Sequence, residues 1–179
     1  MPLSTQKRSL SVWDIAKFSM LGATMFLSRV LMQWIPNIHL LALFIAAFTL
    51  TYRVKALIPL YIYILIEGMF SGFSMWWIPY LYIWFPLWGA VMLVSKLRLP
   101  KGAMTAIYMI VCGLHGLSFG VMYAPAQALM YGLTFDAAVA WVIAGLPFDI
   151  AHCIGDFLAA LLVLPLHNLL RKLEKRPGT

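Results

Sequence analysis

Residues 39–70, HLLALFIAAFTLTYRVKALIPLYIYILIEGMF, decide the fold of this chain, because two long apolar runs flank a short segment that carries Arg53 and Lys55. Apolar runs of this kind are typical of helices that cross a lipid bilayer. Short loops that hold Lys and Arg stay on the cytoplasmic side when such helices insert. The segment therefore predicts two membrane helices joined by a cytoplasmic loop.

The same alternation of apolar runs and basic gaps extends over the whole chain. Basic residues lie before or within the first run and after the second, fourth and sixth runs: Lys7, Arg8, Lys17; Arg53, Lys55; Lys96, Arg98, Lys101; Arg171, Lys172, Lys175, Arg176. The other three gaps, including the connection at 124–136, contain neither Lys nor Arg. We therefore predict an all-α membrane protein with six transmembrane helices, both termini in the cytoplasm and a single integral membrane domain, 1–179. The predicted spans are 13–34, 39–52, 56–70, 78–95, 103–123 and 137–168.

The composition agrees with a protein that has the bilayer as its solvent. Of the 179 residues, 63% are hydrophobic and 11% are charged, whereas soluble domains have about 25% charged residues. The net charge of +7 is accounted for by the basic loops, so we do not expect nucleic acid as a partner. Cys112 and Cys153 lack metal-site spacing, and no HExxH motif is present, so neither a metal nor another cofactor is expected.

Ionisable side chains within the predicted spans are the first functional candidates, because a charge in a membrane is costly. They are Arg29, Glu67, His115, Asp149, His152 and Asp156. The last three follow an i, i+3, i+7 spacing, which places them on one stripe of a helix and predicts that the stripe faces the bundle interior or a cavity. Arg29 can pair with Glu67 or Asp149 as a structural ion pair, or receive a carboxylate from a ligand.

Aromatic and small residues give two further patterns. Tyr80, Trp84 and Trp88 recur at i, i+4, i+8, which indicates lipid-facing or core packing, or one wall of an apolar pocket for a planar ligand. Ser19 and Ala23 have the small-xxx-small spacing that allows close helix approach, and Gly22 lies beside them.

The chain has six predicted spans, two termini predicted to lie in the cytoplasm, and a Ser19-x-x-x-Ala23 pattern. In these features it resembles the substrate-binding S component of energy-coupling factor (ECF) vitamin transporters. The resemblance also includes Gly-Leu-Pro-Phe-Asp149 followed by His152, and Leu-Pro165-Leu. It implies a non-enzymatic subunit, in a prokaryotic plasma membrane, that captures a B-group vitamin or vitamin precursor with high affinity.

The resemblance also implies partners and site residues. A transmembrane coupling protein and two cytoplasmic ATPases would provide transport, which agrees with the absence of a GxxxxGKS or GxxxxGKT phosphate loop. Ser19, Gly22 and Ala23 would contact the coupling protein. The predicted substrate-binding residues are Asn37, His39, Glu67, Trp77, Tyr80, Trp84, Tyr123, Gln127, Asp149 and His152.

Two other classes of protein remain open. A polytopic membrane enzyme would use Asp149, His152 and Asp156 for acid and base chemistry on a lipid or isoprenoid head group, and a structural subunit would bind no ligand.

The identity of the vitamin is open as well. Glu67 and Asp149 beside aromatic residues favour a neutral or cationic heterocycle such as a pyridoxine-like, pyrimidine or thiazole compound. Arg29 keeps an acid such as pantothenate open, and riboflavin and cobalamin also remain.

Overall fold

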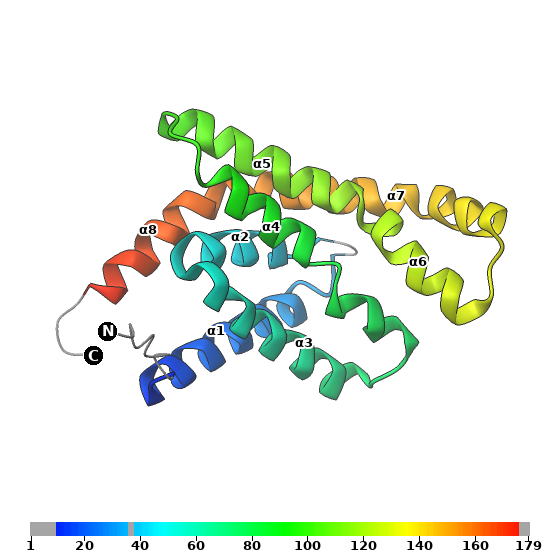
Figure 1. Cartoon of the computed structure of the whole chain (residues 1–179), viewed down its shortest axis with the longest axis horizontal. Helices are drawn as coiled ribbons and strands as arrows, with labels where there is room; N and C mark the ends of the chain where they lie inside the picture. Colours follow the sequence, from blue (N-terminus) through cyan, green and yellow to red (C-terminus); the bar gives the residue numbers. More distant parts are fainter. Residues whose placement is uncertain (1–9, 36–37, 176–179) are drawn as a thin grey trace, which may run out of the picture.

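The computed structural model describes residues 10–35 and 38–175, and every regular element within them is helical (Figure 1). The α-helices are α1 (Val12–Leu31), α2 (Leu41–Tyr52), α3 (Leu57–Ser71), α4 (Phe85–Val94), α5 (Lys101–Leu117), α6 (Phe119–Tyr131), α7 (Phe135–Ala159) and α8 (Val163–Glu174). Three short 3₁₀ helices connect some of them: η1 (Arg53–Ala56), η2 (Met75–Leu81) and η3 (Ala160–Leu162).

Five continuous helical stretches of the described residues are long and apolar enough to cross a membrane. They are Val12–Met32, Leu41–Ser71, Met75–Val94, Lys101–Tyr131 and Phe135–Glu174. The protein is therefore all-α with the helices of a multi-span membrane protein. The predicted number of six spans is not confirmed by this count, which takes α2, η1 and α3 as one stretch.

The chain nevertheless reverses direction within the stretch from α2 to α3. Helices α1 and α3 run parallel, because Asp14 lies 3.5 Å from Lys55 at one end and Arg29 lies 3.0 Å from Glu67 at the other. Helix α2 starts after His39, which lines a cavity together with Arg29. It therefore runs antiparallel to α1 and α3.

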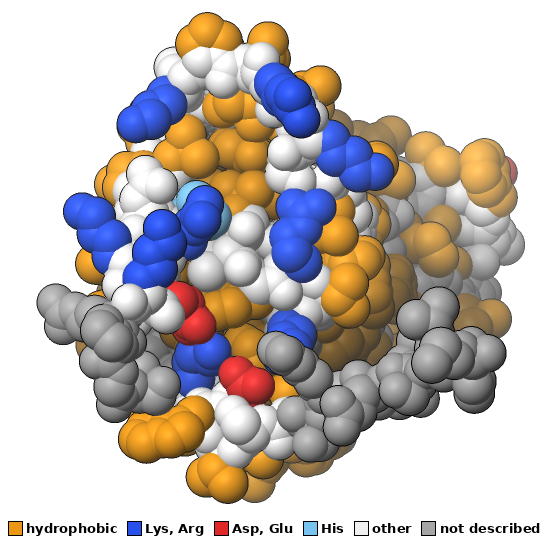
Figure 2. Space-filling model, turned by 60° about the vertical axis from the view of Figure 1, so that its left-hand side comes forward, with side chains coloured by type: hydrophobic (Ala, Val, Ile, Leu, Met, Phe, Trp, Pro, Cys, Tyr) orange, Lys and Arg blue, Asp and Glu red, His pale blue; other side chains and the backbone are white. Residues whose placement is uncertain are grey.

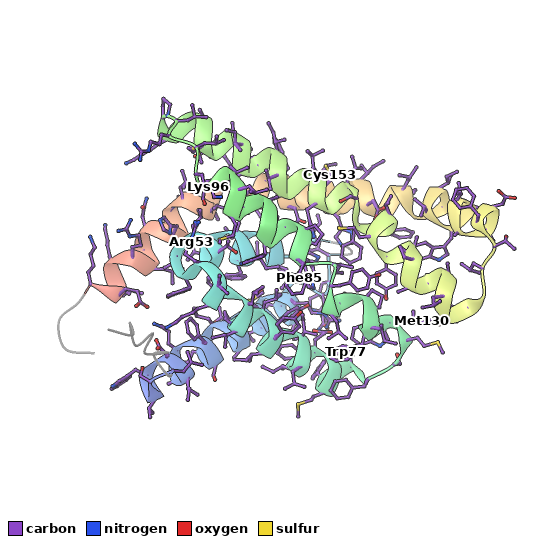
Figure 3. All side chains as sticks on the ribbon, viewed as in Figure 1. Arg53, Trp77, Phe85, Lys96, Met130 and Cys153 are labelled. Atoms are coloured by element: carbon purple, nitrogen blue, oxygen red, sulfur yellow. The ribbon has the colours of Figure 1, made fainter. Side chains whose placement is uncertain are left out.

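Most of the charged contacts gather at the end of the molecule where α1 begins and α8 ends. Lys17 lies 3.0 Å from Glu174 and 3.3 Å from Asp14, and the Tyr52 hydroxyl donates to Glu174. Lys and Arg side chains surround this face, and apolar side chains lie in its middle (Figure 2). In Figure 3, Arg53 and Lys96 lie toward this end, and Trp77 and Met130 lie toward the other. The basic gaps of the sequence thus meet at one end of the fold.

Several predicted helix boundaries differ from those of the structure. The predicted outer connection 124–136 is helical as far as Tyr131, because α6 continues from α5 after a break at Ser118. The predicted span 137–168 is divided among α7, which continues through Pro147, η3 and α8. The predicted span 78–95 is divided between η2, which contains Pro79, and α4, which has Pro86 in its first turn.

Helix α1 contacts α3 closely at Gly22, which is buried. A Cβ atom at this position would lie 2.6 Å from Ile62 Cγ2 and 2.9 Å from the Pro59 carbonyl oxygen. The backbone oxygen cannot move aside as a flexible side chain can. Gly22 therefore supports packing within the chain, whereas Ser19 and Ala23 are exposed.

We expect Gly22→Ala to lower the free energy of unfolding by about 1–3 kcal/mol, because the added methyl group overpacks the contact between α1 and α3. The measurement is thermal unfolding of the purified protein in detergent. Gly89→Ala is the matched control, since nothing lies within 4 Å of its added Cβ and alanine favours a helix over glycine. Equal melting temperatures for the two variants would contradict the assigned contact.

Candidate functional site

Two cavities lie toward the end of the molecule opposite the charged face, and they share Phe119 and His152 as lining residues. The first has a volume of about 290 Å³ and lies beside the end of α1, with Arg29, His39 and Tyr80 in its wall. The second has a volume of about 430 Å³ and lies between η2, α6 and α7. We call them the histidine cavity and the aromatic cavity.

The structure divides the predicted substrate-binding residues between these two cavities and the protein core. His39, Tyr80 and His152 line the histidine cavity, and Tyr123, Gln127, Asp149 and His152 line the aromatic cavity. Glu67, Trp77 and Trp84 line neither one. Asn37 lies outside the described residues.

Helices α5 and α6 pack closely on α7, and this contact places His152 and Asp149 in the walls of the cavities. A Cβ atom at Gly116 would lie 2.8 Å from the His152 carbonyl carbon, and one at Gly120 would lie 2.5 Å from Asp149 Oδ2. The two glycines thus let α7 bring His152 and Asp149 against the start of α6. Asp149, His152 and Asp156 are all buried, which confirms the prediction that their stripe faces the interior.

Arg29 forms an ion pair with Glu67, one of the two partners that the sequence left open. Glu67 is 2% exposed and its Oε1 also accepts a hydrogen bond from the Ser71 hydroxyl at 2.9 Å. The other candidate partner, Asp149, instead accepts from the Gly120 N–H through both carboxylate oxygens, at 3.2 and 3.1 Å. The pair offsets the charge of Arg29 at the wall of the histidine cavity.

Four aromatic side chains form a stacked row along the aromatic cavity. The centroids of His152 and Phe119 lie 4.9 Å apart at 28°, those of Phe119 and Tyr123 lie 6.0 Å apart at 29°, and those of Tyr123 and Trp141 lie 6.0 Å apart at 24°. The Tyr123 hydroxyl donates to the Trp76 carbonyl at 2.6 Å, which fixes the ring. The row and Asp149 line the same cavity, so aromatic rings lie beside a carboxylate, a combination that suits a planar or cationic ligand.

Sequence reasoning missed three contributors to this row and its surroundings: Phe119, Trp141 and Trp76. The i, i+4 spacing of Phe119 and Tyr123 was visible in the sequence and indicates a shared helical face. Trp141 could not have been assigned in this way, because its partner Tyr123 lies on another helix.

The histidine cavity borders a cluster of buried rings. His39 lies 5.1 Å from His152 by ring centroid, and Trp84 stacks on His115 at 5.5 Å. The His115 Nε2 atom lies 2.9 Å from the Ile83 carbonyl oxygen. Because a carbonyl oxygen can only accept, Nε2 carries the proton, and Nδ1 of the neutral ring is left as an acceptor.

Four buried nitrogen atoms of this cluster have no hydrogen-bond partner among the described residues. They are His39 Nδ1, Trp84 Nε1, His115 Nδ1 and His152 Nδ1. A buried polar atom without a partner costs about 1–3 kcal/mol. Two of these nitrogens belong to His39 and His152, which line the cavities, whereas Trp84 and His115 line neither one.

His39 and Asp156 face each other without forming a hydrogen bond. Their Nδ1 and Oδ1 atoms are 3.8 Å apart, which is too long for one. Among residues 10–35 and 38–175, no group of three or more His, Cys, Asp or Glu side chains is placed to hold a metal ion.

Comparison of the chain with models of protein families, with curated proteins and with solved structures finds no significant match. The structure supports the coarser part of the resemblance, an all-helical protein with five long apolar stretches, and does not identify a family. The functional argument therefore rests on the geometry of the two cavities.

Proposed function

We propose that this protein captures a vitamin or vitamin precursor with a planar heteroaromatic ring in the two adjoining cavities, as the substrate-binding subunit of an ECF-type importer. The observation that carries the proposal is the row of stacked rings beside Asp149, next to buried ring nitrogens that have no partner among the described residues. Stacking provides affinity for a flat ring, and the nitrogen atoms provide hydrogen bonds that select its substituents.

The proposal includes six membrane crossings with both termini in the cytoplasm. Support comes from the reversal between α2 and α3, and from the basic residues that gather where α1 begins and α8 ends. Since Lys and Arg mark cytoplasmic loops, the two cavities would open toward the outer half of the membrane. A ligand would then enter from outside the cell.

The charges around the cavities favour a neutral or cationic ligand over an acid. Arg29 is already paired with Glu67. In the aromatic cavity, Asp149 is the acidic group, and π faces attract a delocalised cation. The volume of about 430 Å³ falls in the range of small-molecule sites. A pyrimidine, thiazole or pyridine ring fits this chemistry.

Transport would depend on a transmembrane coupling protein and two ATPases, because the sequence lacks a phosphate loop. Ser19 and Ala23 are exposed on α1, so a helix of the coupling protein can approach them closely. Gly22 faces α3 and would act on this contact only through the packing of α1.

Two substitutions test the cavity and the charge of its ligand. We expect Tyr123→Ala to weaken ligand binding by about tenfold or more, as judged by titration calorimetry with thiamin, pyridoxine, riboflavin and pantothenate. Asp149→Asn retains an oxygen that accepts from Gly120, so we expect a similar loss for a cationic ligand such as thiamin and little change for a neutral one.

Tyr61→Ala is the matched control for Tyr123→Ala. The Tyr61 hydroxyl also donates to a backbone carbonyl of η2, that of Leu81, but the residue lines neither cavity. Equal affinity for Tyr123→Ala and the unmodified protein would remove the aromatic cavity from the site. If the folded protein binds none of the four vitamins, and native mass spectrometry after expression in rich medium finds no retained small molecule, the proposed function is wrong.

The coupling assignment has a separate test. We expect Ser19→Leu combined with Ala23→Leu to abolish vitamin uptake by cells and to leave binding by the purified protein unchanged, because bulky side chains prevent close helix approach. Thr24→Leu is the control, an exposed small residue on another side of α1. Normal uptake by the double variant would contradict the assigned contact.

A further inference from the structure

Another cavity, of about 280 Å³, opens at the charged end of the molecule between the end of α2, the start of α5 and α8. Its polar lining includes Arg53, Lys101 and His167, and its apolar lining includes Leu99 and Leu164. The histidine and aromatic cavities lie toward the opposite end of the molecule and share no lining residue with this one. We call it the basic cavity.

Arg53 holds an unusual backbone conformation at the wall of this cavity. Its φ is +56° and its ψ is −122°, a region that glycine adopts readily and that strains other residues. The Trp88 indole donates to the Arg53 carbonyl at 3.3 Å, and the Arg53 Nη1 atom donates to the Ser95 hydroxyl at 2.6 Å. The side chain is thus fixed at the turn where glycine would relieve the strain.

The cations of the basic cavity have no acidic partner among the described residues. The acidic side chains at this end, Asp14 and Glu174, pair with Lys17 and Lys55. No carboxylate in residues 10–35 and 38–175 forms an ion pair with Arg53 or Lys101. The surrounding face is rich in Lys and Arg (Figure 2). The cavity therefore favours an anion.

The hydrogen bonds of His167 indicate a second property of that anion. The Thr51 hydroxyl donates to the Ala47 carbonyl at 2.8 Å, so its oxygen accepts from His167 Nδ1 at 2.9 Å. The neutral imidazole then has Nε2 as an acceptor. A phosphodiester whose head group carries hydroxyl groups matches both features, because Arg53 and Lys101 can bind its phosphate and His167 can accept from a hydroxyl.

The apolar part of the lining favours a lipid over free phosphate. Leu99 and Leu164 lie in the same wall as Arg53 and Lys101, and apolar side chains continue across the middle of the basic face (Figure 2). Free phosphate gains nothing from apolar surface, whereas the glycerol and acyl parts of a phospholipid do. Basic pockets between membrane helices on the cytoplasmic side bind anionic head groups by this combination.

We propose that the basic cavity binds the head group of an anionic phospholipid that carries hydroxyl groups, of which phosphatidylglycerol is the probe. Arg53 and Lys101 bind the phosphate, and His167 accepts from a head-group hydroxyl. This site is independent of the vitamin site, so either one can be tested without the other.

Native mass spectrometry of the full-length protein released from nanodiscs tests this site. With equal amounts of phosphatidylglycerol and phosphatidylcholine present, we expect phosphatidylglycerol to be retained preferentially. Arg53→Gly should reduce that retention by about tenfold while the protein stays folded, because glycine tolerates the φ of this turn. Lys172→Ala removes the same charge from outside the cavity lining and should retain the lipid.

Three results would overturn the proposal. Equal losses in Arg53→Gly and Lys172→Ala would show that only the general charge of the face attracts lipid. Equal retention of phosphatidylglycerol and phosphatidylcholine by the unmodified protein would exclude an anion site. Complete displacement of the lipid by millimolar inorganic phosphate would assign the cavity to the free anion. If Arg53→Gly does not fold, Lys101→Gln provides the same comparison, since Lys101 lines the cavity at the exposed start of α5.

Discussion

The site of this protein depends on the close approach of α5 and α6 to α7, where Gly116 and Gly120 lie directly against α7. Any larger side chain at either glycine would meet the backbone of His152 or the carboxylate of Asp149. This contact positions Phe119, because Phe119 is the first residue of α6 and lies between the two glycines in the sequence. Phe119 and His152 then stack as the boundary shared by the histidine and aromatic cavities.

The two ends of the molecule differ in how their charged side chains are paired. Toward the cavities, Arg29 pairs with the buried Glu67, and the buried Asp149 accepts from the Gly120 N–H. At the opposite end, Lys and Arg outnumber acidic residues, and Arg53 and Lys101 face a cavity without a carboxylate partner among the described residues. One end thus suits a neutral or cationic ring, and the other suits an anion.

Residue spacing predicted which helix faces are buried better than it predicted which residues line a cavity. The stripe of Asp149, His152 and Asp156 was predicted to be interior and is buried. The i, i+4, i+8 spacing of Tyr80, Trp84 and Trp88 left open lipid-facing or core packing, or a pocket wall. Trp84 is 1% exposed and packs on His115, whereas Tyr80 lines the histidine cavity. A helical period states which side of a helix is covered. It does not state whether the opposing surface is a side chain or a cavity, since that depends on another helix.

The sequence by itself determined that the chain is an all-helical membrane protein, because apolar runs and basic gaps reflect the local cost of placing charge in a bilayer. It also left Arg29 with Glu67, Asp149 or the carboxylate of a ligand as its partner. Only the tertiary structure decided that Glu67 is the partner, that Tyr123 stacks on Trp141, and that the turn at Arg53 forms part of a basic cavity. These contacts join residues from different helices, and their geometry is set by how closely the helices pack, which no local pattern encodes.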